Sequence, residues 1–258
     1  MKKNSLLDLL PLFLYFLLSI SLLAQALNYT SGQIGYPVDD AFIHMAMARH
    51  FAQDGRWSVD LSPFTSASSS PLWTLLLWVT FRLVGVRDWA AGLLSLLTGA
   101  AALLTAQRLL AHSTRRLVRI VLVILVLLFT PLPVLGLTGM EHALHALITA
   151  AVLWSASEWL GSRERSSRPG WGLLALCAVL PVIRYEGLFL LFWIGLALLW
   201  QKRLRAALML GAAGASLMTL YGIISLRNGW AFFPNSVLVK GTSNLSSTAG
   251  LAQFLTQG

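Results

Sequence analysis

Residues 6–27, LLDLLPLFLYFLLSISLLAQAL, are almost entirely apolar. A helix needs about 20 mostly apolar residues to cross the hydrocarbon core of a bilayer, so this run predicts a membrane-spanning helix. The run is longer than the roughly 7–15 apolar residues of a secretory signal peptide, and no clear cleavage site of small residues ends it. With Lys2 and Lys3 before it, we expect a retained first helix with a cytoplasmic N-terminus.

The composition of the whole chain agrees with this prediction. Its 258 residues are 57% apolar and 11% charged, with a mean hydropathy of +0.71, whereas soluble domains are about 45–50% apolar. We therefore expect one all-α, polytopic membrane domain, residues 1–258, with about seven or eight transmembrane or partial segments. After the first helix, the apolar segments are expected at 71–86, 89–110, 120–137, 143–160, 171–183, 188–200 and 206–226.

The basic residues stand in short clusters between the apolar segments. They occur at 2–3, 115–119, 163–168 and 202–205, and they account for most of the net charge of +9. Clusters of this kind are typical of the cytoplasmic loops of membrane proteins, whereas a nucleic-acid-binding surface carries a continuous basic stripe. We expect membrane lipid, and no nucleic acid, among the partners. The single cysteine, Cys177, excludes a disulfide framework and a thiol-rich metal site.

The longest non-apolar stretch, residues 28–70, follows the first helix. It holds four of the ten acidic residues, Asp39, Asp40, Asp54 and Asp60, and we expect it on the extracytoplasmic side. Within it, the run 41–53 has no glycine or proline and closes at an Asp-Gly pair. This pattern predicts an amphipathic helix that lies along the membrane surface.

The basic clusters decide between two topologies. If every segment crosses the membrane, the clusters at 115–119 and 163–168 lie outside, against the positive-inside rule. If one early segment stays on the outer side, every later basic cluster is cytoplasmic, and Glu141, Arg184 and the 235–240 stretch lie outside. We favour the second topology, with 71–86 as the partial segment because it is short and weakly charged at its end.

Ionisable residues beside membrane segments are costly and point to a functional site or an interface. The pair Asp39 and Asp40 could supply a general base that takes the proton of a hydroxyl acceptor. The alternative is a helix cap with a carboxylate favoured by the helix dipole. His44 lies four residues after Asp40 and would share its helix face, although a histidine satisfied by the core or by solvent is the simpler interpretation.

The second half of the chain adds further candidates. Glu141 precedes His142 and His145, but only Glu141 and His145 would share a helix face, so no metal site is predicted. Arg184 interrupts an apolar stretch and suits a phosphate group, unless it only pairs with Glu186.

A last candidate pair follows the final apolar segment. Asn235 and Lys240 lie in and after the tripeptide Pro-Asn-Ser. Lys240 could contact an anionic lipid head, or it could be an ordinary lysine that reaches to the interface.

Taken together, these motifs resemble the GT-C membrane glycosyltransferases, most closely the bacterial arabinofuranosyl- and mannosyltransferase type. The similarity covers residues 36 to 241. Its motifs, in order, are VDDAFI at 38–43 with Arg49 and Gly55 after it, SSPLW at 69–73, TGME at 138–141, IRYEG at 183–187, and FPNS at 233–236 with Lys240.

The resemblance implies a sugar donor on a polyprenyl phosphate and an acceptor hydroxyl on a glycan, lipid or protein. Transfer would be inverting and would occur at the extracytoplasmic face of the cell inner membrane. Asp39 or Asp40 would be the general base, and Glu141 a second acidic residue near the acceptor. Arg184 would hold the donor phosphate and Glu186 would orient it. His44, Asn235 and Lys240 would add substrate contacts. No cofactor is expected, and dependence on a divalent metal stays open.

The sequence departs from the family pattern in two places. Tyr185 stands where the pattern has proline, and the chain ends at Gly258, so the C-terminal region of the family is expected to be missing. Two other functions stay open. The chain could be a transporter or flippase of a lipid-linked sugar, although its halves show no convincing repeat. It could also be a non-catalytic, truncated relative.

Overall fold

The computed structural model describes residues 6–111, 114–161 and 168–239, which fold into helices and connecting loops. In these ranges the only β-type pairing is a single bridge between Trp57 and Phe64. The all-α prediction is confirmed for this part of the chain. The elements are η1 (Leu6–Leu9), α1 (Leu10–Tyr29), α2 (Asp39–Asp54), α3 (Pro71–Val84), α4 (Ala90–Ala111), α5 (Arg116–Phe129), α6 (Leu132–Leu137), α7 (His142–Gly161), α8 (Trp171–Ile183), α9 (Gly187–Trp200) and α10 (Leu204–Arg227).

Four helices are long and apolar enough to cross a membrane: the first, Leu6–Tyr29, and then α4, α7 and α10. Three shorter apolar helices, α3, α8 and α9, have 13 or 14 residues. A helix of 14 residues is only about 21 Å long, less than the roughly 30 Å of a bilayer core. By length and composition the structure therefore supports membrane-spanning helices, but not the full count of seven or eight segments.

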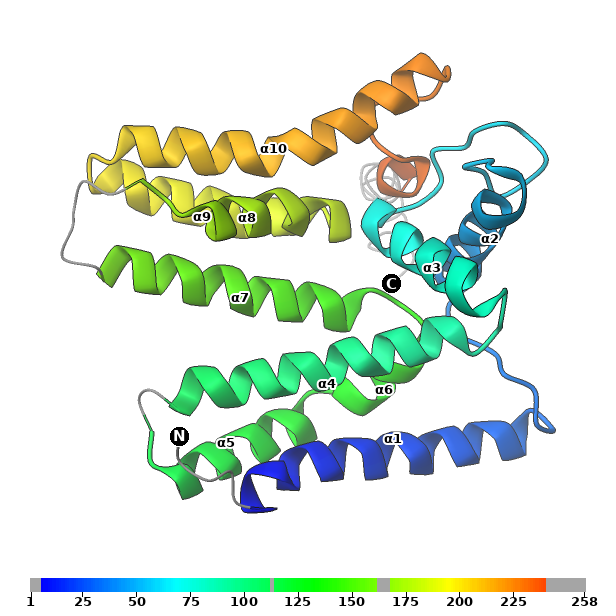
Figure 1. Ribbon diagram of the computed structural model, residues 1–258, viewed down its shortest axis with the longest axis horizontal. Helices are drawn as coiled ribbons and strands as arrows, with labels where there is room; N and C mark the ends of the chain where they lie inside the picture. The colour runs from blue at the N-terminus through cyan, green and yellow to red at the C-terminus, as the bar shows by residue number, and fades with distance from the viewer. Residues whose placement is uncertain (1–5, 112–113, 162–167, 240–258) are drawn as a thin grey trace, which may run out of the picture.

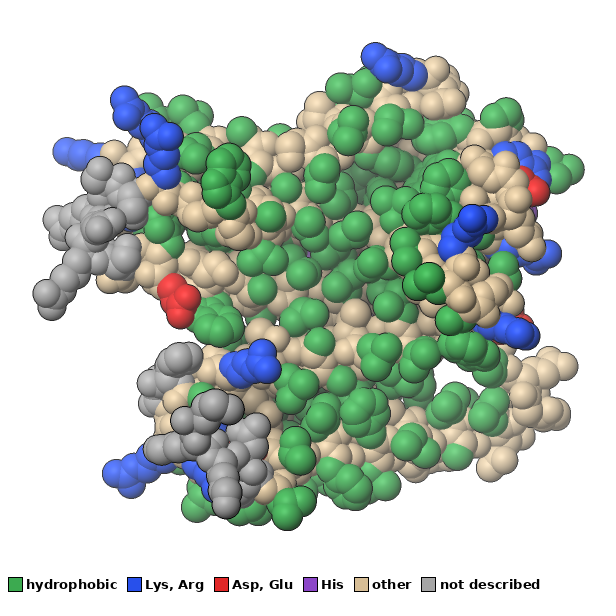
Figure 2. All heavy atoms as spheres, viewed as in Figure 1, with side chains coloured by type: hydrophobic (Ala, Val, Ile, Leu, Met, Phe, Trp, Pro, Cys, Tyr) green, Lys and Arg blue, Asp and Glu red, His purple; other side chains and the backbone are tan. Residues whose placement is uncertain are grey.

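The long helices lie side by side and run between the same two ends of the molecule (Figure 1). Between the same two ends, α5 and α6 follow one another beside α1 and α4, while α8 and α9 pack between α7 and α10. Figure 2 shows apolar side chains across the middle of the visible face and charged side chains toward the two ends. Large apolar side chains such as Phe13, Phe129 and Trp193 are exposed, as expected where helices face lipid.

Helix α3 does not run the length of this bundle. It lies with α2 at one end, which we call the α2 end (Figure 1). Its buried residues Trp73 and Leu77 form a core cluster with Met45 and Ala48 of α2. At this end Tyr36 also accepts a hydrogen bond from the backbone of Gly92, which fixes the chain after α1 against the start of α4. The segment 71–86, which we expect to cross the membrane only in part, thus starts and ends beside α2.

The two ends of the bundle differ in charge. The end opposite α2, which we call the basic end, carries the turns before α5, α8 and α10. Its described charged residues are Arg108, Arg115, Arg116, Arg119, Arg168, Lys202, Arg203 and Arg205, against Asp8 and Glu158. The α2 end carries Arg49, Arg56, Arg82, Arg87, Arg184 and Arg227, against Asp39, Asp40, Asp54, Asp60, Asp88, Glu141 and Glu186. Cations therefore dominate one end only.

Candidate active site

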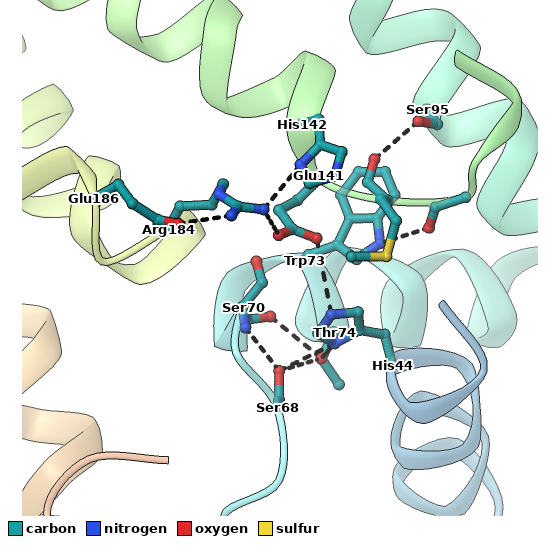
Figure 3. Close-up of polar contacts among 12 residues, drawn as sticks. His44, Ser68, Ser70, Trp73, Thr74, Ser95, Glu141, His142, Arg184 and Glu186 are labelled. Carbon is teal, nitrogen blue, oxygen red and sulfur yellow. Dashed lines mark hydrogen bonds and ion pairs between the residues drawn. The ribbon is translucent and has the colours of Figure 1, made fainter. Parts of the chain in front are cut away.

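Four parts of the chain meet at the α2 end and form one polar cluster (Figure 3). They are helix α2, the start of α3, the loop before α7 and the turn between α8 and α9. Figure 3 shows that His44, Glu141 and Arg184 point toward one another from three of these parts. We call the hydrogen-bonded and ion-paired residues His44, Ser68, Thr74, Glu141, His142, Arg184 and Glu186 the polar cluster.

Glu141 is the centre of the polar cluster. Its side chain is only 1% exposed, and its Oε1 accepts a hydrogen bond from Arg184 Nη1 at 2.8 Å. The loop that carries it is fixed from two sides. Trp73 Nε1 donates to the Gly139 carbonyl at 3.1 Å, and Ser95 Oγ donates to the Met140 carbonyl at 2.8 Å. A buried carboxylate is tolerated here because a guanidinium group pairs with it.

Arg184 stands where α8 ends. Its backbone is extended, with φ −153° and ψ 132°, so the helix breaks after Ile183 although the next residue is Tyr185 and not proline. The chain then folds back so tightly that a Cβ at Gly187 would lie 2.6 Å from Leu180 Cγ. The sequence therefore predicted the break at the right residues, and Gly187, which has no Cβ, permits α9 to approach α8 after the break.

The guanidinium group of Arg184 has partners on both sides. Nη1 contacts Glu141 and, at 2.8 Å, His142 Nδ1, while Nη2 donates to Glu186 Oε1 at 2.7 Å. Arginine only donates hydrogen bonds, so His142 Nδ1 must be the acceptor, which requires an unprotonated Nδ1. Three of the five N–H groups therefore have partners among the described residues. The side chain is 27% exposed, which leaves the Nε–H and one Nη2–H available to a ligand.

Glu186 forms the outer edge of the polar cluster, and its side chain is 56% exposed. Burial raises the pKa of this carboxyl group, but the hydrogen bond and charge of Arg184 outweigh that effect, so the pKa lies below its usual value. Glu186 is therefore ionised at neutral pH. The ion pair that was the simpler alternative for Arg184 is present, and Glu141 adds a second carboxylate to it.

His44 joins the polar cluster from α2 and is 1% exposed. Its Nε2 lies 3.8 Å from Glu141 Oε2, so the two oxygens of Glu141 face different partners. On the other side of the ring, Nδ1 lies 3.1 Å from both Thr74 Oγ1 and Ser68 Oγ, which are 2.9 Å from each other. Two hydrogen-bonded groups therefore lie against each other, Ser68 and Thr74 with His44 on one side and Glu141 to Glu186 on the other. The 3.8 Å between His44 Nε2 and Glu141 Oε2 is too long for a hydrogen bond.

The acidic pair lies just before these two groups. Asp39 and Asp40 are the first two residues of α2, where the helix dipole favours carboxylates. Asp39 is exposed and Asp40 is half-buried, and His44 lies one turn further along the same face as Asp40. The Tyr36 ring packs on Gly139, so the start of α2 adjoins the loop that carries Glu141. The structure thus brings the pair to the α2 end, one turn from the polar cluster.

The chain after α10 also returns to this end. The backbone N–H of Asn235 donates to the Ser66 carbonyl at 2.9 Å, and Trp230 Nε1 donates to the Phe64 carbonyl at 3.1 Å. The Phe233 ring lies edge-on to Tyr185, with 6.0 Å between centroids. Asn235 is therefore held beside the loop between α2 and α3 with an exposed side chain. Lys240, the other residue expected here, lies outside the described residues.

Sequence patterns named His142 only as a possible metal ligand and did not connect it, Ser68 or Thr74 with the polar cluster. Helical spacing paired Glu141 with His145, but Glu141 lies in the turn before α7, and the neighbouring His142 contacts Arg184 instead. Ser68 lies in the serine- and threonine-rich run before Pro71, and Thr74 lies in the first turn of α3. Among the described residues, no group of three or more His, Cys, Asp or Glu side chains is placed to hold a metal ion.

Comparison with protein-family models, with curated proteins and with solved structures found no match to this chain. The case for a function therefore rests on the residues of the chain and on their geometry.

Gly139 provides a test of the loop that carries Glu141. Its φ is +69°, and a Cβ would lie 2.7 Å from the Tyr36 ring, whereas Gly55 has φ +68° and open space around it. Backbone strain should cost Gly55→Ala about 1 kcal/mol, and the added clash should cost Gly139→Ala about 1–3 kcal/mol more. Thermal unfolding in detergent should rank the variants in that order. Equal midpoints would contradict the packing of Tyr36 on Gly139.

Proposed function

We propose that this chain is a membrane glycosyltransferase that transfers a sugar from a polyprenyl-phosphate donor to an acceptor hydroxyl at the extracytoplasmic face. One observation carries the proposal. Three motifs far apart in the sequence, the acidic pair with His44, the Glu141 loop and Arg184 with Glu186, come together at the α2 end. These are three of the motifs on which the resemblance to GT-C glycosyltransferases depends. A common role in one site would explain why the chain carries all three.

The difference in charge between the two ends supports the orientation. Loops rich in lysine and arginine stay in the cytoplasm, so the basic end would be cytoplasmic and the α2 end extracytoplasmic. In this multi-pass arrangement, α5 with α6, and α8 and α9, complete the crossings between the long helices, and α3 stays on the outer side. The location that fits such a protein is the cell inner membrane, with the N-terminus in the cytoplasm.

The proposed reaction is an inverting displacement. The acceptor oxygen attacks the anomeric carbon, and the bond from that carbon to the phosphate oxygen breaks, so that polyprenyl phosphate leaves with the electron pair. Asp39 or Asp40 takes the proton of the acceptor hydroxyl. Arg184 offers its remaining N–H groups to the phosphate, where negative charge develops as the bond breaks. Its partial exposure permits this contact.

Glu141 has a supporting role in this proposal. Its burial keeps it from direct contact with an acceptor, and its two oxygens face Arg184 and His44. It therefore acts as a positioning residue that holds the guanidinium group toward the donor phosphate. Glu186 restrains the same group from the exposed side. A group held by several partners reorganises little as charge develops, which favours electrostatic stabilisation.

An apolar cavity supports a lipid donor. It has a volume of about 430 Å³ and lies between α9 and α10. The cavity begins near Leu188, four residues after Arg184, and extends to Leu199 and Leu204. Its lining is made of leucine, phenylalanine, alanine and glycine side chains. A prenyl chain there would have its phosphate near Arg184, because the cavity starts at the turn that carries this residue.

The test uses the purified full chain in liposomes with polyprenyl phosphates that carry labelled arabinofuranose or mannose. The proposal predicts that label passes from the donor to an acceptor and that an equal amount of polyprenyl phosphate is released. Movement of the intact labelled donor between leaflets would instead support a flippase and overturn the proposal. No change in either donor, with acceptors of all three classes present, would favour a non-catalytic relative.

A further inference from the structure

A second polar cavity lies at the basic end, far from the polar cluster. It has a volume of about 640 Å³ and opens between η1, the end of α4 and the start of α5. Basic and polar side chains dominate its lining, among them Asp8, Gln107, Arg108, Arg115, Arg116 and Arg119. Nothing in the proposed transfer reaction uses this cavity.

The cavity has an excess of positive charge. Asp8 Oδ1 accepts from Arg119 Nη2 at 2.8 Å and from Arg116 Nε at 3.3 Å, and Gln107 donates to the Asp8 carbonyl at 3.0 Å. These contacts hold the wall of the cavity in place. Within the described part of the chain, Arg108 and Arg115 form no ion pair with a carboxylate. One carboxylate among four arginines leaves a site suited to an anion with more than one oxygen.

An apolar cavity adjoins the basic one. Its volume is about 480 Å³, and only leucine and phenylalanine side chains of η1 and α1 line it, among them Phe13 and Phe16. The two cavities share Leu9. A soluble phosphate would use only the basic cavity. A phospholipid has a charged head and apolar chains joined at a short distance, so it would occupy both.

We propose that this pair of cavities binds an anionic phospholipid of the leaflet at the basic end, with its phosphate among Arg108, Arg115 and Arg119. Clusters of arginine and lysine at the cytoplasmic ends of membrane helices attract anionic lipid heads, at about 1 kcal/mol for each residue near the surface. The shape of the two cavities adds to this electrostatic attraction. The bound lipid would join η1 to α4 and α5, and its binding does not depend on sugar transfer.

The experiment measures phosphatidylglycerol binding to the detergent-solubilised full chain by native mass spectrometry. The variant Arg108→Gln/Arg115→Gln removes the two arginines that pair with no carboxylate among the described residues. Both are exposed, so the fold should remain intact. The control Arg87→Gln/Arg227→Gln removes two exposed arginines from the α2 end. We expect about 30-fold weaker binding in the first variant, about 5-fold for each arginine, and wild-type binding in the control.

Two further measurements distinguish a phospholipid headgroup from free phosphate as the ligand. Phosphatidylcholine, which carries no net charge, should bind the wild type and both variants equally weakly. Millimolar inorganic phosphate should not displace phosphatidylglycerol from the wild type. Equal phosphatidylglycerol binding by the first variant and the control would overturn the proposal, as would full displacement by inorganic phosphate, which would indicate a site for a soluble anion.

Discussion

Replacing the acidic pair one residue at a time is expected to abolish sugar transfer in at least one variant. General-base catalysis contributes about 10²–10⁴-fold, so either Asp39→Asn or Asp40→Asn should lower kcat by that factor. Asparagine keeps the shape of the side chain but cannot take a proton. Because both residues lie in the first turn of α2, the lost dipole interaction should cost only about 0.3–1 kcal/mol of stability.

The control for this prediction lies on the same helix. Asp54 is the last residue of α2, at the opposite end of the helix from the acidic pair, and it pairs with Arg56. Asp54→Asn should leave kcat within about twofold of the wild type, because exposed ion pairs contribute little. Full transfer by both the Asp39 and the Asp40 variants would show that neither residue is the general base. A matching loss in the Asp54 variant would point to general damage of α2.

Removing Arg184 should affect stability and activity together. Arg184→Gln leaves Glu141 buried without its cationic partner, which typically costs about 3–5 kcal/mol. Loss of a group that stabilises charge in the transition state lowers kcat by about 10²–10³-fold. Arg184→Lys should recover part of the stability and little of the activity, because an ammonium group cannot contact Glu141, Glu186 and a phosphate in one plane.

A double variant separates these two effects. In Glu141→Gln/Arg184→Gln both charges are gone, so most of the stability lost in Arg184→Gln should return, with a coupling of at least about 1 kcal/mol in thermal unfolding experiments. Transfer should stay as low as in Arg184→Gln. Strictly additive losses of stability would contradict the ion pair, and recovery of transfer by the double variant would show that Arg184 only neutralises Glu141.

The helices were largely predictable from the sequence because the signal is local. The segment expected at 171–183 coincides with α8, and the break after it falls at Arg184, as expected from the polar interruption. The segment expected at 120–137 is two helices, α5 and α6, because Pro131 follows Thr130 and the chain turns there. The segment expected at 71–86 corresponds to α3, Pro71–Val84, and its partial crossing of the membrane stays a prediction.

The polar cluster was only partly predictable, because its contacts join residues that are far apart in the sequence. Arg184 pairs with Glu141 across 43 positions, and no periodicity connects them. The same holds for His44 and the hydroxyls 24 and 30 residues away. Local patterns could pair Arg184 with Glu186 but could not show that Glu141 is buried behind it. That burial changes the proposed role of Glu141 from acceptor contact to support of Arg184.

Sugar transfer by intact, right-side-out membrane vesicles is the most direct test of a reaction at the extracytoplasmic face that depends on Asp39 and Asp40. A water-soluble, short-chain polyprenyl-phosphate sugar and an impermeant acceptor are added outside, without any nucleotide sugar. The wild type is compared with Asp39→Asn/Asp40→Asn. We expect labelled product and released polyprenyl phosphate in right-side-out vesicles of the wild type only. Product that forms only in inverted vesicles, or equally with the double variant, would contradict this expectation.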